Sequence, residues 1–210
     1  MIELYTWTTP NGRKVTTALE EMGLPYVVKP VNIHKDEQFA PDFLKISPNN
    51  KIPAIVDTDT GIAMMESGAI LLYLAEKTGK LLPKDEKGRW KVIEWLMFQM
   101  GGAGPILGQV HHFVKFNAGK APYAEERFSK EAQRLYGVMD KQLADNEFIA
   151  GELSIADFAI WPWIGRFDWQ KIDLNEFPNV KRWYLAMAAR PSVQKGWAIP
   201  PSDQQIPMPA

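Results

Sequence analysis

The spacing of apolar residues divides the chain into a first part of mixed strands and helices and a second part of helices. Short apolar and β-branched runs predict four strands, at residues 2–5, 26–31, 54–56 and 62–65. Helical spacing predicts three helices, at residues 14–22, 36–46 and 66–78, of which the second is short and irregular. In the second of these helices we expect Phe39, Phe43 and Leu44 to face inward. The predicted order is strand–helix–strand, helix, strand–strand–helix, with a hairpin turn at residues 57–61.

The second part begins after a polar, turn-rich segment. Its pattern predicts five helices, at residues 88–99, 122–146, 154–170, 177–190 and 192–197. The glycine-rich segment 101–105 interrupts the first of them, and we expect a bend there. The last segment has four prolines and no periodicity, so we expect it to be extended or partly disordered. The expected organisation is a first domain at 1–79, a linker at 80–87, an all-helical domain at 88–198 and an extended tail at 199–210.

Composition narrows the classes of function. The 210 residues are 46% hydrophobic and 23% charged, as in globular proteins with a sizeable core. A net charge of −1 argues against a nucleic-acid partner. No apolar run is long enough for a membrane helix, and the first residues lack the pattern of a signal peptide. We therefore expect a cytoplasmic protein with no membrane partner and, given no cysteine and three histidines, no metal site.

The absence of cysteine is informative because the first part has the element order of a thioredoxin-like unit. Such units, when they perform redox chemistry themselves, usually have C-x-x-C at the start of the first helix. Here residues 8–12 read Thr-Thr-Pro-Asn-Gly, which offers hydroxyl and amide groups. Any sulfur chemistry must therefore come with a ligand that the protein binds and activates.

Residues 47–56, Ser-Pro-Asn-Asn-Lys-Ile-Pro-Ala-Ile-Val, contain a proline directly before a predicted strand. A cis bond before Pro53 would present the backbone of Ile52 to a peptide ligand, as an added strand would. The alternative is an ordinary trans proline at the start of an edge strand.

Glu66 and Ser67 stand at the start of the third predicted helix. Ser67 is a candidate N-cap, and the N–H groups of that turn would attract a ligand carboxylate. Glu66 could pair with a ligand ammonium, so that the two residues would hold an α-amino-acid head group. The alternative is a capped helix without a ligand.

Taken together, the run P-A-I-V, the hairpin and E-S-G-A-I-L-L-Y-L resemble the glutathione-binding domain of the glutathione transferases. Ser154 and Asp157 have the spacing of a capping box at the start of a buried helix, which is an element of the same family. The resemblance extends to about residue 197 and implies an α/β thioredoxin-like N-terminal domain followed by an all-α C-terminal domain.

Several segments are similar to the nu-class enzymes, which are bacterial glutathione-dependent disulfide-bond oxidoreductases related to a yeast nitrogen regulator. These segments are residues 9–14, 47–53, 108–113 and 161–163. The chain departs from other classes in having Trp7 where several of them have a catalytic tyrosine, and in having no cysteine or serine near position 10. Tyr5 is the nearest tyrosine, but its place in a strand predicts a core residue.

The resemblance implies that Thr9 and Asn11 face the sulfur of glutathione. Their chemistry agrees, because a hydroxyl and an amide at a helix N-terminus can both donate hydrogen bonds to a thiolate. The resemblance also implies a set of glutathione-binding residues: Gln38 and Lys51 for the glycyl end, Ile52 and a cis Pro53 for the cysteinyl backbone, Glu66 and Ser67 for the γ-glutamyl end, and Arg127 close to the ligand. Arg127 has the alternative of a solvated surface residue.

The sequence does not assign a definite role to some polar and aromatic residues of the helical part. For His111 and His112 we favour a polar network at the bend over direct catalysis, and Gln99 has no assigned role. Trp161 and Trp163 are expected in the core and in a pocket wall.

The leading hypothesis is a homodimeric enzyme that reduces disulfides by thiol–disulfide exchange, with glutathione as co-substrate. The apolar, glycine-rich segment 101–107 could pack against the second subunit. One alternative is a transferase or peroxidase acting on electrophiles or hydroperoxides. Another is a transferase-like binding or regulatory module without activity.

Overall fold

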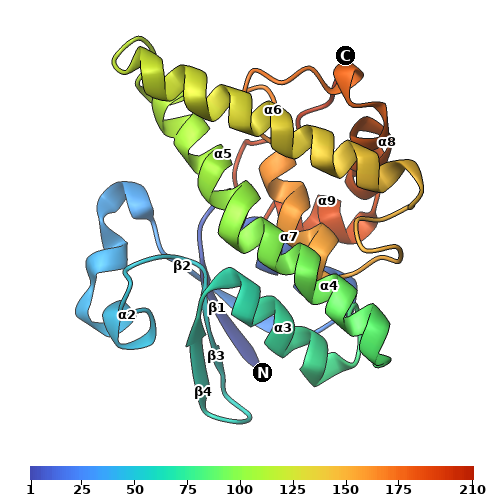
Figure 1. Cartoon of the computed structure of the whole chain (residues 1–210). Helices are drawn as coiled ribbons and strands as arrows, with labels where there is room; N and C mark the ends of the chain where they lie inside the picture. Colours follow the sequence, from blue (N-terminus) through green and yellow to red (C-terminus); the bar gives the residue numbers. More distant parts are fainter. The chain divides into compact units, whose positions relative to one another are not determined.

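A four-stranded sheet with the order β2-β1-β3-β4 forms the centre of the first part of the chain (Figure 1). β1 runs parallel to β2 and antiparallel to β3, and β3 pairs antiparallel with β4. Tyr5 pairs with Ala54, which pairs in turn with Met65, so the end of β1, the start of β3 and the end of β4 meet at one end of the sheet. The strands are β1 (Ile2–Thr6), β2 (Tyr26–Pro30), β3 (Ala54–Asp57) and β4 (Ile62–Met65).

Three α-helices accompany this sheet, in the predicted order. α2 and α3 lie on opposite sides of it (Figure 1), and α1 packs against α3. Buried aliphatic side chains fill the space between α1, α3 and the sheet, including Leu4, Val15, Leu19, Ile55, Ile70 and Leu74. The helices are α1 (Pro10–Met22), α2 (Pro41–Ile46) and α3 (Ser67–Thr78), with 3-10 turns at Ile33–Lys35 and Glu37–Phe39.

Two helices of the first part differ in detail from the sequence-based prediction. α1 begins at Pro10 and not at residue 14, because the side chain of Thr9 caps it. The short, irregular helix predicted at 36–46 is irregular as expected: it consists of a 3-10 turn at Glu37–Phe39 and the short α2, and another 3-10 turn precedes it. Phe43 is buried as expected, but Phe39 is 53% exposed, so the prediction that Phe39 faces inward is wrong. Its 3-10 turn is followed by Ala40 in an extended conformation, which breaks the helical face that Phe39 was expected to share.

The computed structural model describes residues 1–210, which form two units. The first unit is Met1–Leu82 with Arg190–Ile206, and the second is Pro83–Ala189 with Pro207–Ala210. α9 (Pro191–Trp197) therefore belongs to the first unit, where it packs on α1. The sequence pattern had placed this helix in the all-helical part. The division into domains at 1–79 and 88–198 stays a prediction.

The second unit is helical, with α7 at its centre. α7 contacts α4, α5 and α8, and its residues are buried except Trp163. The predicted capping box is confirmed: Ser154 and Asp157 cap α7 reciprocally. The helices are α4 (Glu86–Phe98), α5 (Gly104–Val110), α6 (Pro122–Ala144), α7 (Ile155–Ile164) and α8 (Pro178–Ala188).

The glycine-rich segment joins α4 to α5 through a π-helical turn at Gln99–Ala103, and a second one follows at His111–Phe116. The sequence pattern missed the helix between these turns. After Trp197 the chain has no further helix or strand. No helix has both the length and the hydropathy needed to span a membrane.

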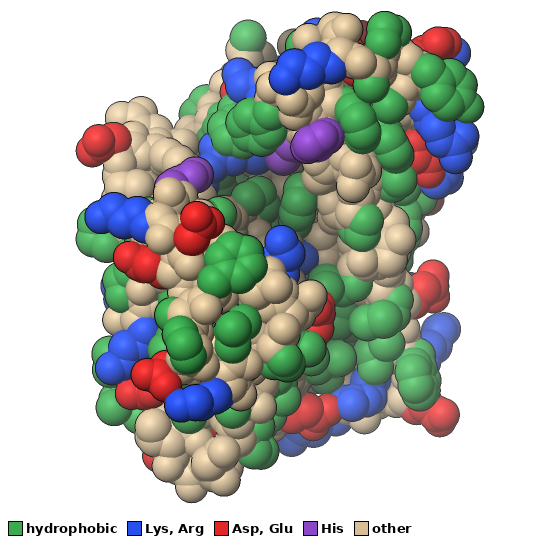
Figure 2. Space-filling view, turned by 90° about the vertical axis from the view of Figure 1, so that its left-hand side faces the viewer, with side chains coloured by type: hydrophobic (Ala, Val, Ile, Leu, Met, Phe, Trp, Pro, Cys, Tyr) green, Lys and Arg blue, Asp and Glu red, His purple; other side chains and the backbone are tan.

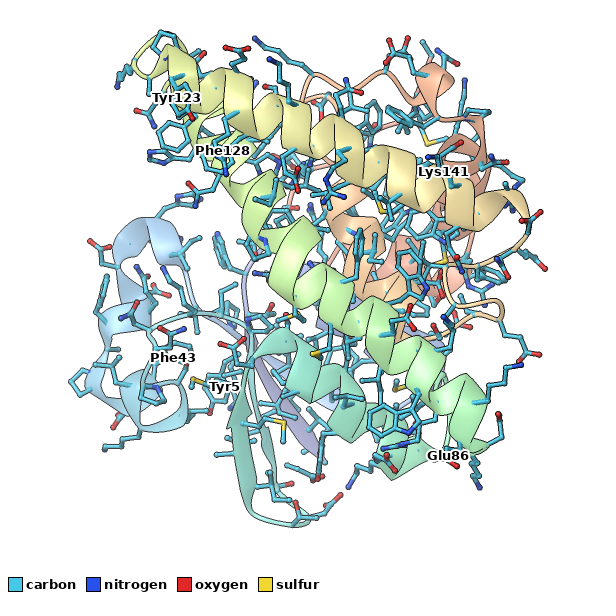
Figure 3. The ribbon with its side chains drawn as sticks, in the orientation of Figure 1. Tyr5, Phe43, Glu86, Tyr123, Phe128 and Lys141 are labelled. Carbon is cyan, nitrogen blue, oxygen red and sulfur yellow. The ribbon has the colours of Figure 1, made fainter.

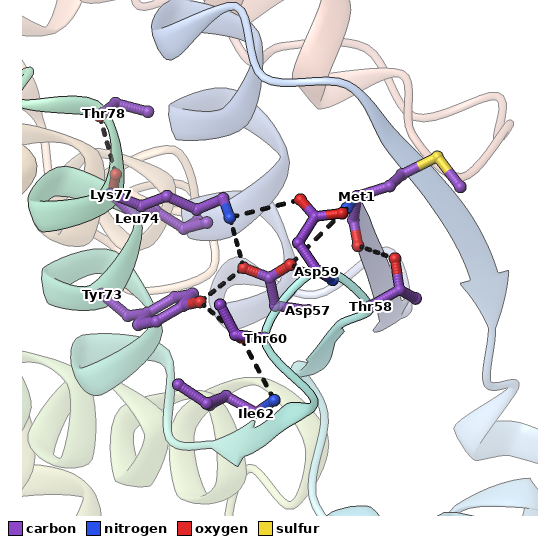
Figure 4. Close-up of polar contacts among 10 residues, drawn as sticks. All are labelled: Met1, Asp57, Thr58, Asp59, Thr60, Ile62, Tyr73, Leu74, Lys77 and Thr78. Carbon is purple, nitrogen blue, oxygen red and sulfur yellow. Dashed lines mark hydrogen bonds and ion pairs between the residues drawn. The ribbon is translucent and has the colours of Figure 1, made fainter.

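At the opposite end of the sheet, an ion-pair cluster ties the β3–β4 turn to α3 (Figure 4). Asp57 accepts hydrogen bonds from the hydroxyl of Tyr73 at 2.5 Å and from Lys77 at 2.7 Å. Burial alone would raise the pKa of Asp57, but these two donors hold it well below its usual value. The N-terminal ammonium of Met1 pairs with Asp59. On the face shown in Figure 2, acidic and basic side chains are interspersed, in keeping with the small net charge.

Candidate functional site

The N-terminus of α1 carries two of the predicted site residues. Thr9 is the N-cap, and its Oγ1 accepts a hydrogen bond from the backbone N–H of Gly12 at 3.1 Å. Because that oxygen is the acceptor in the cap, its own proton can be donated to another group. Pro10 occupies the first helical position and Asn11 the second, and the side chains of Thr9 and Asn11 are both partly exposed.

The turn into α1 is tight at Gly12. A Cβ atom at this position would lie 2.2 Å from the carbonyl oxygen of Trp7 and 2.5 Å from Oγ1 of Thr6. A glycine is thus required for the backbone of residues 6–12 to fold closely enough to place Thr9 and Asn11 at the helix start.

The loop before β3 contains the predicted cis bond, which is confirmed between Ile52 and Pro53. The buried Ser47 shapes this loop, since its hydroxyl donates to the carbonyl of Lys51 at 2.8 Å and its own carbonyl accepts from Asn50 at 2.9 Å. Ile52 is 9% exposed, whereas Lys51 is exposed. Because β3 starts at the next residue, the cis bond lies at the end of the sheet where β1 ends.

The N-terminus of α3 differs in detail from the prediction. Glu66 is the N-cap, with φ 72° and ψ 109°, and Ser67 is the first helical residue, so the assignment of Ser67 as N-cap is corrected. Glu66 makes no side-chain capping hydrogen bond and is exposed, while Ser67 is 4% exposed. The first N–H groups of a helix lack partners within it and, together with the helix dipole, favour an anion.

Lys14 is a residue of this region that the sequence analysis missed. It is on α1, is 1% exposed, and donates from Nζ to Oγ of Ser67 at 3.2 Å. Burial lowers its pKa to about 7, and the carboxylate of Glu66 partly opposes this shift. All residues of α1 from Gly12 to Leu19 are buried, so the periodicity of the helix gives no sign that Lys14 is special.

The strand register brings together the segments that carry most of the predicted site. The residues that follow β1, precede β3 and follow β4 are at one end of the sheet, and they include Thr9, Ile52, Pro53, Glu66 and Ser67. The hydrogen bond between Lys14 and Ser67 joins the first turns of α1 and α3 there.

Few contacts within the protein fix the side chains of the remaining predicted site residues, Gln38, Lys51 and Arg127. The amide nitrogen of Gln38 is 3.4 Å from Asp36, and its amide oxygen is buried without a hydrogen-bond partner. Arg127 belongs to the second unit, where it is exposed on α6 and lines a cavity of about 590 Å³. Tyr123 and Phe128, labelled on α6 in Figure 3, also line this cavity. The roles of all three toward a ligand stay predictions.

Tyr5 has its ring against Phe43, with centroids 6.1 Å apart (Figure 3), and its hydroxyl donates to Glu3 at 3.2 Å. Burial and the Glu3 carboxylate raise the pKa of Tyr5, so it is poorly suited to supply a phenolate. Tyr5 is therefore a packing residue, as its position in the strand predicted.

In the second unit, His111 belongs to a buried network. Its ring stacks on Trp163 at 5.5 Å, and its Nε2 is 3.1 Å from the amide of Gln170. Burial and the nearby Arg166 lower its pKa to about 4, so the imidazole is neutral. The interpretation as a polar network is confirmed for His111, whereas His112 is exposed. The fully buried Trp161 donates to the carbonyl of Tyr184 at 3.1 Å and is a core residue.

The chemistry of these two helix starts suits a ligand with two different anionic groups. A hydroxyl and an amide at the start of α1 suit an anionic sulfur, and the start of α3 suits a carboxylate. The chain has no thiol of its own, and no cluster of three or more metal-binding side chains is present.

Comparison with known proteins gives consistent matches. Residues 8–77 match the family described as "Glutathione S-transferase, N-terminal domain", and residues 103–191 match "Glutathione S-transferase, C-terminal domain". Disulfide-bond oxidoreductase YfcG of Escherichia coli is 50% identical over 198 residues, which cover 91% of this chain and 92% of that protein. Disulfide-bond oxidoreductase YghU of the same organism is 42% identical over 212 residues, covering 93% and 73%.

Among solved structures, a glutathione transferase from Pseudomonas putida with one glutathione disulfide bound per subunit has a TM-score of 0.90 and 43% identity. The similarity covers 95% of this chain and 91% of that one. The predicted fold class, an α/β thioredoxin-like N-terminal domain and an all-helical C-terminal domain, is thereby confirmed. Because both halves match and the identity holds over nearly the whole length, the chain belongs to the glutathione S-transferase family.

Proposed function

We propose that the chain is a glutathione-dependent disulfide-bond oxidoreductase of the nu class. The observation that carries this proposal is the pair Thr9 and Asn11 at the start of α1, in a chain without cysteine. Such a site can stabilise a thiolate supplied by a ligand but cannot form a mixed disulfide with the protein. Two relatives named as disulfide-bond oxidoreductases, at 50% and 42% identity, support the same reaction.

The bound glutathione would extend across the end of the sheet. Its γ-glutamyl carboxylate would lie at Ser67 and its ammonium near Glu66, since these groups match in charge. Its cysteinyl backbone would pair with Ile52 ahead of the cis Pro53, which directs its sulfur toward Thr9 and Asn11. Gln38 and Lys51 would hold the glycyl end, and Arg127 would be close to the ligand, as the family resemblance implies.

The reaction transfers two electrons from two glutathione thiols to one disulfide. The first thiolate attacks one sulfur of the disulfide, the S–S bond breaks, and the other sulfur leaves as a thiol after protonation. The thiolate of a second glutathione then attacks the mixed disulfide, which yields glutathione disulfide and a second thiol. Thr9 and Asn11 would raise the thiolate fraction of glutathione at neutral pH, because an unperturbed thiol has a pKa of about 8.5.

The enzyme would act in the cytoplasm, where reduced glutathione is abundant enough to drive the reduction. It would be a homodimer. Supporting this, α4 exposes two large apolar side chains seven residues apart, Trp90 at 60% and Met97 at 48%, and Gly101 and Pro105 after it are also exposed. Light scattering should give twice the 23.8 kDa subunit mass at micromolar concentration, and a monomer would contradict the dimer.

The test of the function is a comparison of substrates with glutathione as the sole electron donor. Hydroxyethyl disulfide should be reduced rapidly, while chlorodinitrobenzene should be conjugated slowly, because no tyrosine occupies position 7 to assist aromatic substitution. If conjugation or hydroperoxide reduction were faster than disulfide reduction, disulfide reduction would not be the main activity of the enzyme. Binding of glutathione with no turnover of any substrate would point to a regulatory module.

A further inference from the structure

A buried lysine reaches the start of α3 from the neighbouring helix. Lys14 is 1% exposed, and its Nζ is 3.2 Å from Oγ of Ser67, which is 4% exposed. Burying an ammonium is unfavourable for folding, and an unbranched apolar side chain of similar length would avoid this cost. The position of this charge, behind a residue of the proposed γ-glutamyl site, suggests a role in binding.

The protonation state of Lys14 decides the direction of its hydrogen bond with Ser67. An ammonium has three donors and no acceptor, so it donates to Oγ and leaves the Ser67 proton to be donated away from Lys14. A neutral amine has a lone pair, which can accept that proton. The charged form, which can only donate, therefore directs the hydroxyl proton toward a ligand, whereas the neutral amine allows both directions.

Lys14 also adds charge to the N-terminus of α3. The helix dipole places roughly half a positive charge at a helix N-terminus, and a neighbouring ammonium adds to the attraction for an anion. Glu66, the N-cap, is exposed, so the ammonium and not the carboxylate is the buried charge at this helix end.

From this geometry we infer that Lys14 is a positioning residue for the γ-glutamyl carboxylate of bound glutathione: it turns the Ser67 hydroxyl toward the carboxylate and supplies a buried positive charge beside it. The inference rests on the proposed function, because it assumes that glutathione occupies this end of the sheet. It goes further in that it links the binding of glutathione to the uptake of a proton.

The linkage follows from the environment of Lys14. Burial lowers its pKa to about 7, and a bound carboxylate would raise it again, since the anion favours the ammonium. Glu66 is the charged group whose field acts on Lys14 from the start of α3. Other charged groups on the elements around α1 have partners of their own: Lys195 pairs with Glu20, Arg190 with Glu21, and Lys77 in the last turn of α3 with Asp57. On α1 itself, the guanidinium of Arg13 stacks on Trp197.

The experiment measures the affinity for S-methylglutathione, which has no titrating thiol, by calorimetry from pH 6 to pH 8. If binding raises the pKa of Lys14 by one unit, the affinity should fall about fivefold over this range, and about half a proton should be taken up at pH 7.5. Proton uptake is obtained by comparing buffers with different ionisation enthalpies. Lys14→Met should bind about tenfold more weakly at pH 6, with no pH dependence from this group. Lys14→Arg should keep the affinity at pH 6 and lose the decline toward pH 8.

Each outcome decides between the two ideas. A parent protein that does not bind S-methylglutathione at any pH overturns the proposed function as well as this inference. A parent that binds without proton uptake overturns the role of Lys14 alone, and this measurement needs no variant. Equal affinities and equal pH profiles for the parent and Lys14→Met would also overturn it, while leaving glutathione binding intact.

Discussion

The indole N–H of Trp183 donates to the carboxylate of Asp157 at 2.9 Å, joining α8 to α7 through two side chains that are fully buried. The same carboxylate accepts from the backbone N–H groups of Ile149 and Ser154, each at 2.9 Å, and from the Ser154 hydroxyl. Burial raises the pKa of Asp157 to about 6, although these four donors favour the ionised form. One side chain thus fixes a helix start, a loop and a neighbouring helix.

Asp157→Asn should destabilise the protein by about 2–4 kcal/mol, because the amide turns an NH₂ group toward donors that need an acceptor. Asp173→Asn is the matched control, since Asp173 is an exposed cap and accepts only from Asn175 at 2.9 Å. Urea unfolding of both variants provides the comparison. Equal losses would show that the buried network contributes no more than a surface cap.

Gly12→Ala should be strongly destabilising and should also reduce glutathione binding. The new Cβ would be 2.2 Å from a backbone oxygen, so the turn before α1 would have to shift. Gly137→Ala is the control, because nothing lies within 4 Å of its Cβ position on α6, and alanine there should stabilise by roughly 0.5–1 kcal/mol. Thermal unfolding of the two variants tests this, and a Gly12→Ala protein as stable as the parent would contradict the contact.

Lys14→Met should make the protein more stable at pH 6. The folded-state pKa of about 7 is below the ordinary 10.5, so the unfolded chain binds the proton more tightly. The cost of burying the charge is therefore complete below pH 7 and is lost as the pH rises toward 10.5. We expect a gain on the order of 2–4 kcal/mol at pH 6 that shrinks by pH 9. Denaturant unfolding at both pH values measures it, and a variant that is less stable at both would refute it.

The double variant Thr9→Val/Asn11→Ala should lower the rate of disulfide reduction more than tenfold. Each hydrogen bond to a charged group is worth roughly 1.5–3 kcal/mol. The apparent pKa in the pH–rate profile should rise toward that of the unbound thiol. Thr9→Ser keeps both the hydroxyl and the cap, so it should retain most of the activity. Comparable rates for the parent and the double variant would show that Thr9 and Asn11 have no catalytic role.

Glu66→Gln should weaken glutathione binding about tenfold, because the ligand ammonium would lose its ionic partner while the backbone conformation is unaffected. Glu152→Gln, at an exposed position of the second unit, should bind like the parent. Calorimetry distinguishes the two, and an unchanged affinity in Glu66→Gln would exclude Glu66 from the site.

Features encoded over short stretches could be predicted from the sequence. The four strands and the capping box of Ser154 and Asp157 depend on periodicity and spacing within a few residues. The helix that begins at Gly104 was not predicted, because glycine and proline usually end helices. Here a π-helical turn continues the helical backbone from α4 into α5.

Features that depend on distant parts of the chain could not be found in this way. The contact of Lys14 with Ser67 spans 53 positions, and neither residue is unusual within its own helix. The packing of α9 on α1 was also missed. It depends on Gly196, where a Cβ atom would be 2.5 Å from the Cα of Thr17, and no local pattern marks a glycine for such an approach.

The placement of α9 has a consequence for the order of events during synthesis. The guanidinium of Arg13, in the first turns of α1, stacks on the ring of Trp197 at 3.5 Å, and the hydroxyl of Thr16 donates to the carbonyl of Gly196 at 2.7 Å. The helix that begins at the proposed thiolate site is thus covered by residues that are translated after all the helices of the second unit. While the ribosome is still making the second unit, this face of α1 stays uncovered, and a fragment ending at Leu82 would keep it so. The nascent chain can complete its first unit only after the segment Arg190–Ile206 has emerged.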